Sequence, residues 1–179
     1  MLGVDLISLG PSRVLSVVDF QPLHPTAEYA AKYIAPLATI HARYPDLHGK
    51  MSGKFYDDAS FFSSQMLFGR FTNENLVDQV VLPGHRDYLD KYIKTVALAQ
   101  PDASSNNVGV VMQRQTAYDT YSAAKDPAVG LFDAYFGKEW SHDFVYKFLF
   151  DRAVKGTNPK MTHSFVVNPH TGNPSIQPR

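Results

Sequence analysis

The stretch LGVDLISLGPSRVLSVVDF, residues 2–20, decides the fold. It contains two apolar runs rich in β-branched residues, separated by Gly-Pro-Ser-Arg, with Pro11 where a type I turn favours proline. This pattern predicts an antiparallel hairpin formed by residues 2–9 and 14–21. Side chains alternate between the two faces of a strand, so Asp5 is expected among apolar neighbours of its own face.

The length of the turn decides how the two aspartates of this hairpin are related. A four-residue loop, our first expectation, pairs Leu9 with Val14. It also sets Asp5 opposite Val18 and sends Asp19 to the other face. A three-residue loop reverses that relation, because a shift of one residue moves every side chain of a strand to the opposite face.

The rest of the chain shows helical periodicity and one more strand-like run. Strands followed by helices favour an α/β fold with a central antiparallel sheet over a doubly wound parallel one. The predicted elements are a helix over 26–43, capped by Thr26 and interrupted at Pro36; a strand over 61–71; helices over 84–99, over 108–123 and from Pro127; a helix over 141–150 capped by Ser141; and a loop over 101–107.

Composition excludes several chemistries. The chain has 179 residues, 17 basic and 17 acidic, so it has no net charge with which to hold nucleic acid. It has no cysteine, which excludes disulfides, thiolate catalysis, cysteine-bound zinc and an internal iron–sulfur cluster. No apolar run reaches the length of a membrane span, and no nucleotide-binding glycine motif is present. Aromatic residues make up 13% of the chain, which suits either an aromatic core or a pocket for a planar ligand.

Three charged residues are candidates for a functional site. Asp5, if buried in its strand, would have a raised pKa and could donate a proton, although backbone donors or solvent could equally satisfy it. Arg70 shares a predicted strand face with Phe68 and Ser64 and could hold a carboxylate above an aromatic floor, or could simply face solvent. Asp126 precedes Pro127, the pattern of a helix N-cap followed by proline at the first helical position.

The histidines and the Ser-His-Asp sequence at 141–143 do not indicate a catalytic or metal site. None of the seven histidines has the spacing of a helical metal-binding pair. Triad residues approach one another from separate segments, so three consecutive residues do not have the required geometry. We expect no bound metal.

These motifs together resemble the ferredoxin-dependent bilin reductases. The matching stretches are GVDLISLG, VLSVVDFQPL, RYPDL, FFSSQMLFGRF and, above all, YDTYSAAKDPAVGLFDAYFGKEWSHDFVYKFLF, which together run from residue 3 to about residue 150. The resemblance implies a three-layer α/β/α sandwich with a central antiparallel sheet, in which an open-chain tetrapyrrole lies between the sheet and the C-terminal helices. Residues 1–151 would form this domain, and residues 152–179 a disordered tail.

The resemblance also implies a function. The most similar member of the family reduces biliverdin to 15,16-dihydrobiliverdin, a step toward phycoerythrobilin, by a radical mechanism in which ferredoxin supplies electrons and no cofactor is bound. Asp5 and Asp126 would be the proton donors, and Arg70, Phe68 and Ser64 would contact the substrate. Asp19 receives no catalytic role. The alternatives are a sister bilin reductase that forms phycoerythrobilin, and a bilin-binding protein without activity.

Further expectations concern what surrounds the chain. The family has an additional N-terminal segment of about one-third of its length, so the domain is expected to be N-terminally incomplete, with one sheet edge unpaired. The implied partners are ferredoxin, which could face Arg13, Lys138 or Lys147, and the next bilin reductase of the pathway, with no nucleic acid and no membrane. We expect a monomer in the plastid stroma if the source is eukaryotic, or in the cytoplasm if it is cyanobacterial.

Overall fold

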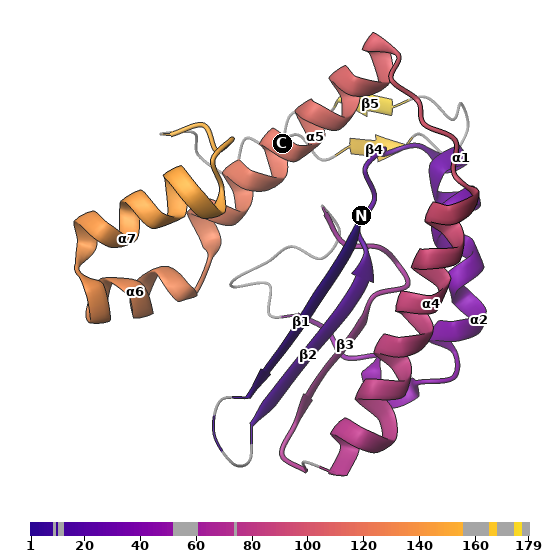
Figure 1. The fold of residues 1–179 in the computed structure, drawn as a ribbon, viewed down its shortest axis with the longest axis horizontal. Coiled ribbons are helices and arrows are strands. Elements are labelled where there is room, and N and C mark those ends of the chain that lie inside the picture. The colour runs from indigo at the N-terminus through magenta and orange to yellow at the C-terminus, as the bar shows by residue number, and fades with distance from the viewer. Residues whose placement is uncertain are drawn as a thin grey trace. The chain divides into compact units, whose positions relative to one another are not determined.

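The computed structural model of the chain describes residues 1–8, 10, 13–51, 61–73, 75–155, 165–167 and 174–176. The chain divides into two compact units. Unit 1 comprises Met1–Met51 and Asp58–Asp102, and unit 2 comprises Ser52–Asp57 and Ala103–Arg179. Figure 1 labels the helices and strands of both.

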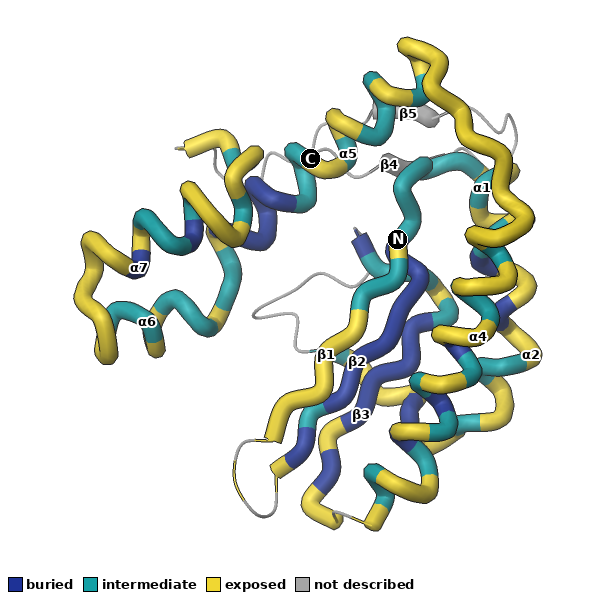
Figure 2. Tube along the Cα trace, viewed as in Figure 1, coloured by how far each residue is buried: buried dark blue, intermediate teal, exposed yellow. Residues whose placement is uncertain are grey.

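Unit 1 is built on a three-stranded antiparallel sheet with the order β1-β2-β3. Its strands are β1 (Leu2–Ser8), β2 (Val14–Phe20) and β3 (Leu67–Phe71). The central strand β2 is almost wholly buried, whereas most of β1 is exposed (Figure 2). The predicted hairpin and the antiparallel sheet are therefore confirmed.

The register of the hairpin differs from our first expectation. Asp5 pairs with Val17 rather than with Val18, and Gly3 pairs with Asp19. Directly paired residues lie on the same face of a sheet, so Asp5 and Asp19 share a face. The four-residue-loop register is thus wrong, and the relation given by the three-residue loop is correct.

The strand predicted over 61–71 is shorter in the structure. Regular pairing begins only at Leu67, because the preceding residues form a turn in which the Met66 amide donates to the carbonyl oxygen of Ser63. Phe68 and Arg70 do share one face of β3, as predicted, whereas Ser64 lies in the turn before the strand.

The helical part of unit 1 begins as predicted at Thr26, whose side chain accepts from the amide of Tyr29 at 3.2 Å. Pro36 lies where the regular helix is broken, as expected for a residue that lacks an amide hydrogen. The segment consists of α1 (Ala27–Tyr29), a π-helical turn (Ala30–Ile34), a 3₁₀ turn (Ala35–Leu37) and α2 (Ala38–His41). Next come a 3₁₀ turn (Pro45–Leu47), a π-helical turn (Val77–Val81) and α4 (Leu82–Leu98).

The core of unit 1 lies between the sheet and this helical layer. Val14, Val18 and Phe20 of β2 contribute from one face, and Leu37 and Tyr88 contribute from the helices. Phe20 meets Tyr88 edge to face, with ring centroids 5.9 Å apart. Figure 1 shows α2 and α4 along the same side of the sheet. The face of β2 that carries Val17 and Asp19 is therefore the one these helices do not cover.

Unit 2 is mostly helical. The loop predicted over 101–107 is shorter than expected, because Ser104 caps a helix that begins at Ser105. A stripe of aromatic side chains spaced four residues apart, Phe136, Trp140, Phe144 and Phe148, continues from α6 through α7, with neighbouring ring centroids 4.5–5.2 Å apart. The elements are α5 (Ser105–Lys125), α6 (Ala128–Phe136), α7 (Lys138–Phe144), a π-helical turn (Val145–Leu149), β4 (Phe165–Val167) and β5 (Pro174–Ile176).

One expectation about unit 2 needs correction. Ser141 is not a helix cap: α7 begins at Lys138, directly after Gly137, whose φ of 84° ends α6, and Ser141 lies buried within α7. Within the segment 152–179, the described residues include β4 and β5, which pair antiparallel, and the disordered tail stays a prediction. The other residues of that segment beyond Lys155 lie outside the described residues.

Candidate active site

The face of the sheet opposite α2 and α4 carries four charged or aromatic side chains discussed above, Asp5, Asp19, Phe68 and Arg70. Asp5, Val17 and Phe68 form one row across the three strands, because Asp5 pairs with Val17 and Val17 pairs with Phe68. The next row carries Arg70, which pairs with Leu15. Asp19 pairs with Gly3 and lies on the same face, so the Asp5 row lies between Asp19 and Arg70. This face of the sheet therefore combines an exposed acid and an exposed guanidinium group with a buried aromatic ring.

Burial differs sharply among these residues. Phe68 is buried, and it packs with Val17 and Met66 in an apolar cluster. Asp5 and Arg70 are exposed. The Arg70 guanidinium lies over the Phe68 ring, 5.7 Å from its centroid, a cation–π arrangement that holds the side chain along the sheet surface. Arg70 is thus both exposed and beside the Phe68 ring, and its role stays a prediction.

Asp19 is the acid that sequence reasoning set aside, and it is the buried one, with only 1% of its surface exposed. Its carboxylate accepts from the Ser63 amide at 2.8 Å and from the Ser63 hydroxyl at 2.5 Å. Burial raises the pKa of Asp19 above its ordinary value, and the two hydrogen bonds from Ser63 partly oppose that shift. The signal that could have found it is its position inside an unbroken apolar strand.

A cavity of about 430 Å³ opens beside Ser63, in unit 1. His41 and His48 stack in its wall, with ring centroids 3.9 Å apart and planes 8° from parallel. Burial, and then the neighbouring His48, lower the pKa of His41, while a hydrogen bond to the backbone of Met66 acts in the opposite direction. The cavity is lined by His41, His48, Gly49, Lys50, Phe62, Ser63, Ser64 and Met66. Ser64, a predicted substrate contact, is therefore at this cavity.

Asp126 lies in unit 2, at the junction between α5 and α6. Its amide donates to the carbonyl oxygen of Ser122 at 2.8 Å, which ends α5. Its carboxylate oxygen Oδ1 accepts from the amide of Ala128 at 2.8 Å, which starts α6. The capping role expected from the Asp-Pro sequence is confirmed, and the carboxylate is half-buried.

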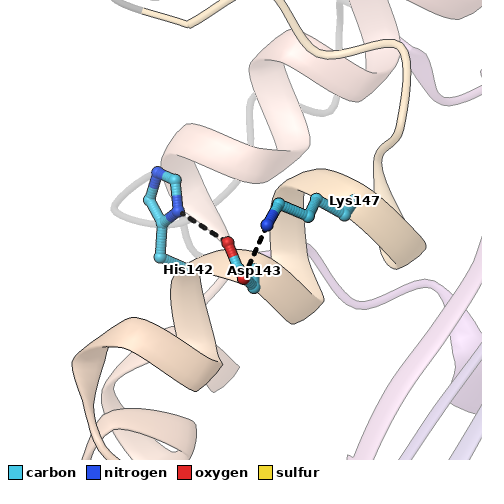
Figure 3. A network of polar contacts seen from close by, with 3 residues as sticks. All are labelled: His142, Asp143 and Lys147. Carbon is cyan, nitrogen blue, oxygen red and sulfur yellow. Dashed lines mark hydrogen bonds and ion pairs between the residues drawn. The ribbon is translucent and has the colours of Figure 1, made fainter.

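The Ser-His-Asp sequence does not form a triad. Buried Ser141 donates to the carbonyl oxygen of Val129 at 3.5 Å, away from its neighbours. Asp143 instead forms an ion pair with Lys147 at 2.6 Å, and the His142 ring lies 3.6 Å from the same carboxylate (Figure 3). The hydrogen bond from Lys147 lowers the pKa of Asp143. This is a surface network on one helical segment.

The described residues contain neither a metal-binding cluster nor a membrane-spanning helix. In the described ranges, no three histidine, aspartate or glutamate side chains gather closely enough to hold a metal ion. None of the helices in the same ranges is long and apolar enough to cross a membrane.

An α/β unit with an antiparallel sheet that presents acid, aromatic and guanidinium groups on one face is what the bilin reductase resemblance implies. Comparison with known proteins agrees: residues 1–151 match the family described as ferredoxin-dependent bilin reductase. The chain belongs to this family.

Individual relatives and a solved structure are similar to the chain. It is 42% identical over 154 residues to a 15,16-dihydrobiliverdin:ferredoxin oxidoreductase of Nostoc punctiforme, covering 86% of this chain and 63% of the relative. A Gloeobacter violaceus protein of the same name is 41% identical with the same coverage. The fold resembles that of phytochromobilin synthase from tomato, solved with biliverdin, with a TM-score of 0.71 and 22% identity over 87% of this chain and 56% of that one. The chain thus spans less than two-thirds of the length of these proteins.

Proposed function

We propose that the chain acts as a ferredoxin-dependent bilin reductase that converts biliverdin to 15,16-dihydrobiliverdin. The observation that carries the proposal is the row of Asp5, Val17 and Phe68 beside Arg70, in a chain that belongs to this family. The names of the two cyanobacterial relatives support the choice of the 15,16 bond.

The sheet face supplies three elements of the reaction. Phe68 and Val17, with the side chains packed on them, form an apolar cluster on this face, and Arg70 offers a bidentate donor for a propionate carboxylate. Asp5 lies on β1, an outer strand of the described sheet, on the same face as Val17 and Phe68. A carboxyl group in this place is suited to deliver a proton to a carbon of a ligand that lies against the sheet.

Reduction of one carbon–carbon double bond takes two electrons and two protons. Ferredoxin would deliver the electrons singly, so the bilin would pass through a radical, with no bound cofactor. Asp5 would donate one proton and Asp126 the second. The Ala128 amide, which donates to Asp126 Oδ1 at 2.8 Å, would hold this carboxyl group in place at the start of α6.

Anaerobic turnover with reduced ferredoxin and biliverdin tests the proposal. The expected product absorbs at shorter wavelength, because saturation of the 15,16 bond divides the conjugated system. Asp5→Asn and Asp126→Asn should each lose turnover by about 10²-fold or more, the typical contribution of a positioned proton donor. Asp90→Asn is the matched control, since Asp90 is an exposed acid on α4, which covers the opposite face.

Each other outcome has a defined meaning. Unchanged turnover in both Asp5→Asn and Asp126→Asn would contradict their assigned roles. A product reduced at the A-ring diene would favour the sister reductase. Binding of biliverdin with a spectral shift, but no change after electrons are added, would replace the enzyme by a bilin-binding protein.

The proposed partners are ferredoxin, biliverdin and the next bilin reductase of the pathway. Arg13 and Lys138 are exposed basic residues that could face an acidic ferredoxin, whereas Lys147 is already paired with Asp143. We propose a monomer, located in the cytoplasm if the source is cyanobacterial, as the relatives are, and in the plastid stroma if it is eukaryotic. Size-exclusion chromatography with and without reduced ferredoxin tests the monomeric state and the complex with ferredoxin.

A further inference from the structure

We propose that Asp119 and Thr120 of α5 are positioning residues for the reaction, because they hold the chain that returns from α7 and thereby fix the direction of the Asp126 carboxylate. The inference rests on the proposed function, in which Asp126 donates a proton. Both side chains are buried, and both lie in the C-terminal half of α5. Burial of a polar group is costly unless the group is hydrogen-bonded, so the partners of these two side chains show what they hold.

Both side chains accept hydrogen bonds from the backbone of one short segment. The Asp119 carboxylate accepts from the Arg152 amide at 3.3 Å. The Thr120 hydroxyl accepts from the Val154 amide at 3.0 Å. The amide between these two donors, that of Ala153, donates within its own turn. The hydrogen bonds from Arg152 and Val154 to α5 together form a clasp.

The clasp closes the chain between α5 and the segment that follows the π-helical turn (Val145–Leu149). Its two hydrogen bonds join residues 33 and 34 positions apart, so α6, α7 and the aromatic stripe lie within the closed part (Figure 1). A pair of helices that is anchored at one end can turn about that end, whereas anchoring at both ends fixes its direction. The donors of both bonds lie just beyond residues 1–151, the part that matches the family, so the family assignment does not account for the clasp.

Asp126 lies at the other end of the closed part, where a turn of α6 and α7 would act on it. Its amide donates to the Ser122 carbonyl oxygen at 2.8 Å and so belongs to α5, whereas its carboxylate accepts from the Ala128 amide at the start of α6. The direction of the carboxylate therefore depends on the angle between α5 and α6. A proton donor must lie within hydrogen-bond reach of the atom that it protonates, and a displacement of about 1 Å can cost about 10²-fold in rate.

The first experiment needs no bilin. Amide hydrogen exchange of the 179-residue chain is followed by NMR in Asp119→Ala and Thr120→Val, which remove the acceptors, and in Asp119→Asn and Thr120→Ser, which retain them. We expect the Ala128 amide, which Asp126 holds, to exchange about tenfold faster in the first pair and at nearly the wild-type rate in the second. Thr95→Val is the matched control, because the Thr95 hydroxyl, like that of Thr120, donates at 2.7 Å to the carbonyl oxygen four residues earlier, but it lies on α4.

Two results of this experiment would overturn the inference. One is an exchange rate of the Ala128 amide that stays unchanged in both Asp119→Ala and Thr120→Val. The other is an equal acceleration of the amides in the middle of α5, which would show general destabilisation of the helix.

The second experiment links the clasp to the reaction. Turnover with reduced ferredoxin and binding of biliverdin are measured for Asp119→Ala alone and combined with Asp126→Asn. We expect Asp119→Ala alone to lower kcat about tenfold and to change biliverdin binding less than about twofold, and Asp119→Asn to restore kcat. In the Asp126→Asn chain, Asp119→Ala should have little further effect, because both changes act on the same proton transfer. Equal losses of kcat in the two chains would show a structural role alone and overturn the inference.

The failure of this inference can be distinguished from the failure of the proposed function. Turnover by the wild-type chain with an unchanged kcat in Asp119→Ala and Thr120→Val would retain the function and overturn the positioning role. Absence of turnover in the wild-type chain would refute the proposed function and, with it, the role of the clasp in the reaction. A response of the Ala128 amide to the clasp would still show that the clasp directs the Asp126 carboxylate.

Discussion

Replacement of Asp19 by asparagine tests the electrostatics of the sheet face. The carboxylate accepts two hydrogen bonds from Ser63, and the Ser63 hydroxyl accepts from the amide of Gln65 at 3.0 Å. Asparagine has one acceptor and one donor in the same space, so it can accept from the Ser63 amide and must donate to the hydroxyl. The hydroxyl hydrogen then has lost its acceptor, which costs about 1–3 kcal/mol of unfolding free energy.

The cost depends on pH. Burial raises the pKa of Asp19 in the folded protein, so between about pH 4 and that raised value the folded state binds more protons than the unfolded state. The unfolding free energy that Asp19 contributes is therefore fully present in acid and falls as the pH rises. Each tenfold difference in proton affinity between the two states removes about 1.4 kcal/mol by neutral pH. Asparagine does not titrate, so the advantage of the wild type over Asp19→Asn should shrink from pH 4.5 to pH 8.

Urea unfolding followed by far-UV circular dichroism at several pH values measures this difference. The control is Asp143→Asn: the hydrogen bond from Lys147 lowers the pKa of Asp143, so its contribution is lost only in acid below about pH 4, and its difference should stay flat over this range. A constant difference for Asp19→Asn over this range would refute the raised pKa and would be the result expected if the Ser63 hydrogen bonds outweighed burial.

Two further substitutions test the packing and titration of unit 1. Gly49→Ala should lower the unfolding free energy by about 1–3 kcal/mol, because a Cβ there would lie 2.9 Å from the Phe68 carbonyl oxygen. The control is Gly130→Ala, whose Cβ would have nothing within 4 Å and which should be neutral or stabilising. Urea unfolding measures both. His85 Nε2 lies 2.8 Å from the buried Ser16 hydroxyl, and burial lowers the pKa of His85. The contribution of His85 to the unfolding free energy should therefore be present above about pH 6.5 and lost in acid. His85→Gln should flatten the fall in unfolding free energy between pH 7 and pH 5; an unchanged slope would contradict this.

The sequence predicted the hairpin and the sheet because alternation of apolar residues and the Gly-Pro turn are local signals. The sequence left the register open. Whether the loop between Ser8 and Val14 has an odd or an even number of residues decides which face Asp19 takes, and the turn residues allow either loop length. Ser141 was misassigned for a related reason. A serine before a helical run looks like a cap, but Gly137, with its positive φ, allows α7 to start four residues earlier than a cap at Ser141 would allow.

Only part of the candidate site could be predicted from the sequence, and the reasons are physical. Phe68 and Arg70 share a face because strand periodicity is reliable within a short run. The burial of Asp19 and the exposure of Asp5 could not be read from either strand alone, because β2 is the middle strand and β1 has a described partner on one side only. His41 and His48 are seven residues apart and stack only because the chain turns between α2 and the sheet. No helix or strand periodicity predicts a contact across such a turn.

The two proposed proton donors require different substitutions, because Asp126 also caps the start of α6. Asp5 is exposed on β1, so Asp5→Asn should leave the unfolding free energy nearly unchanged, and any lost turnover reports on chemistry. Asp126 accepts from the Ala128 amide, which Asn can do and Ala cannot. Asp126→Ala should therefore cost about 1 kcal/mol of unfolding free energy and turnover together, whereas Asp126→Asn should keep the cap and lose turnover alone. If Asp126→Asn retains full turnover while Asp126→Ala loses it, Asp126 serves the reaction only by joining α5 to α6.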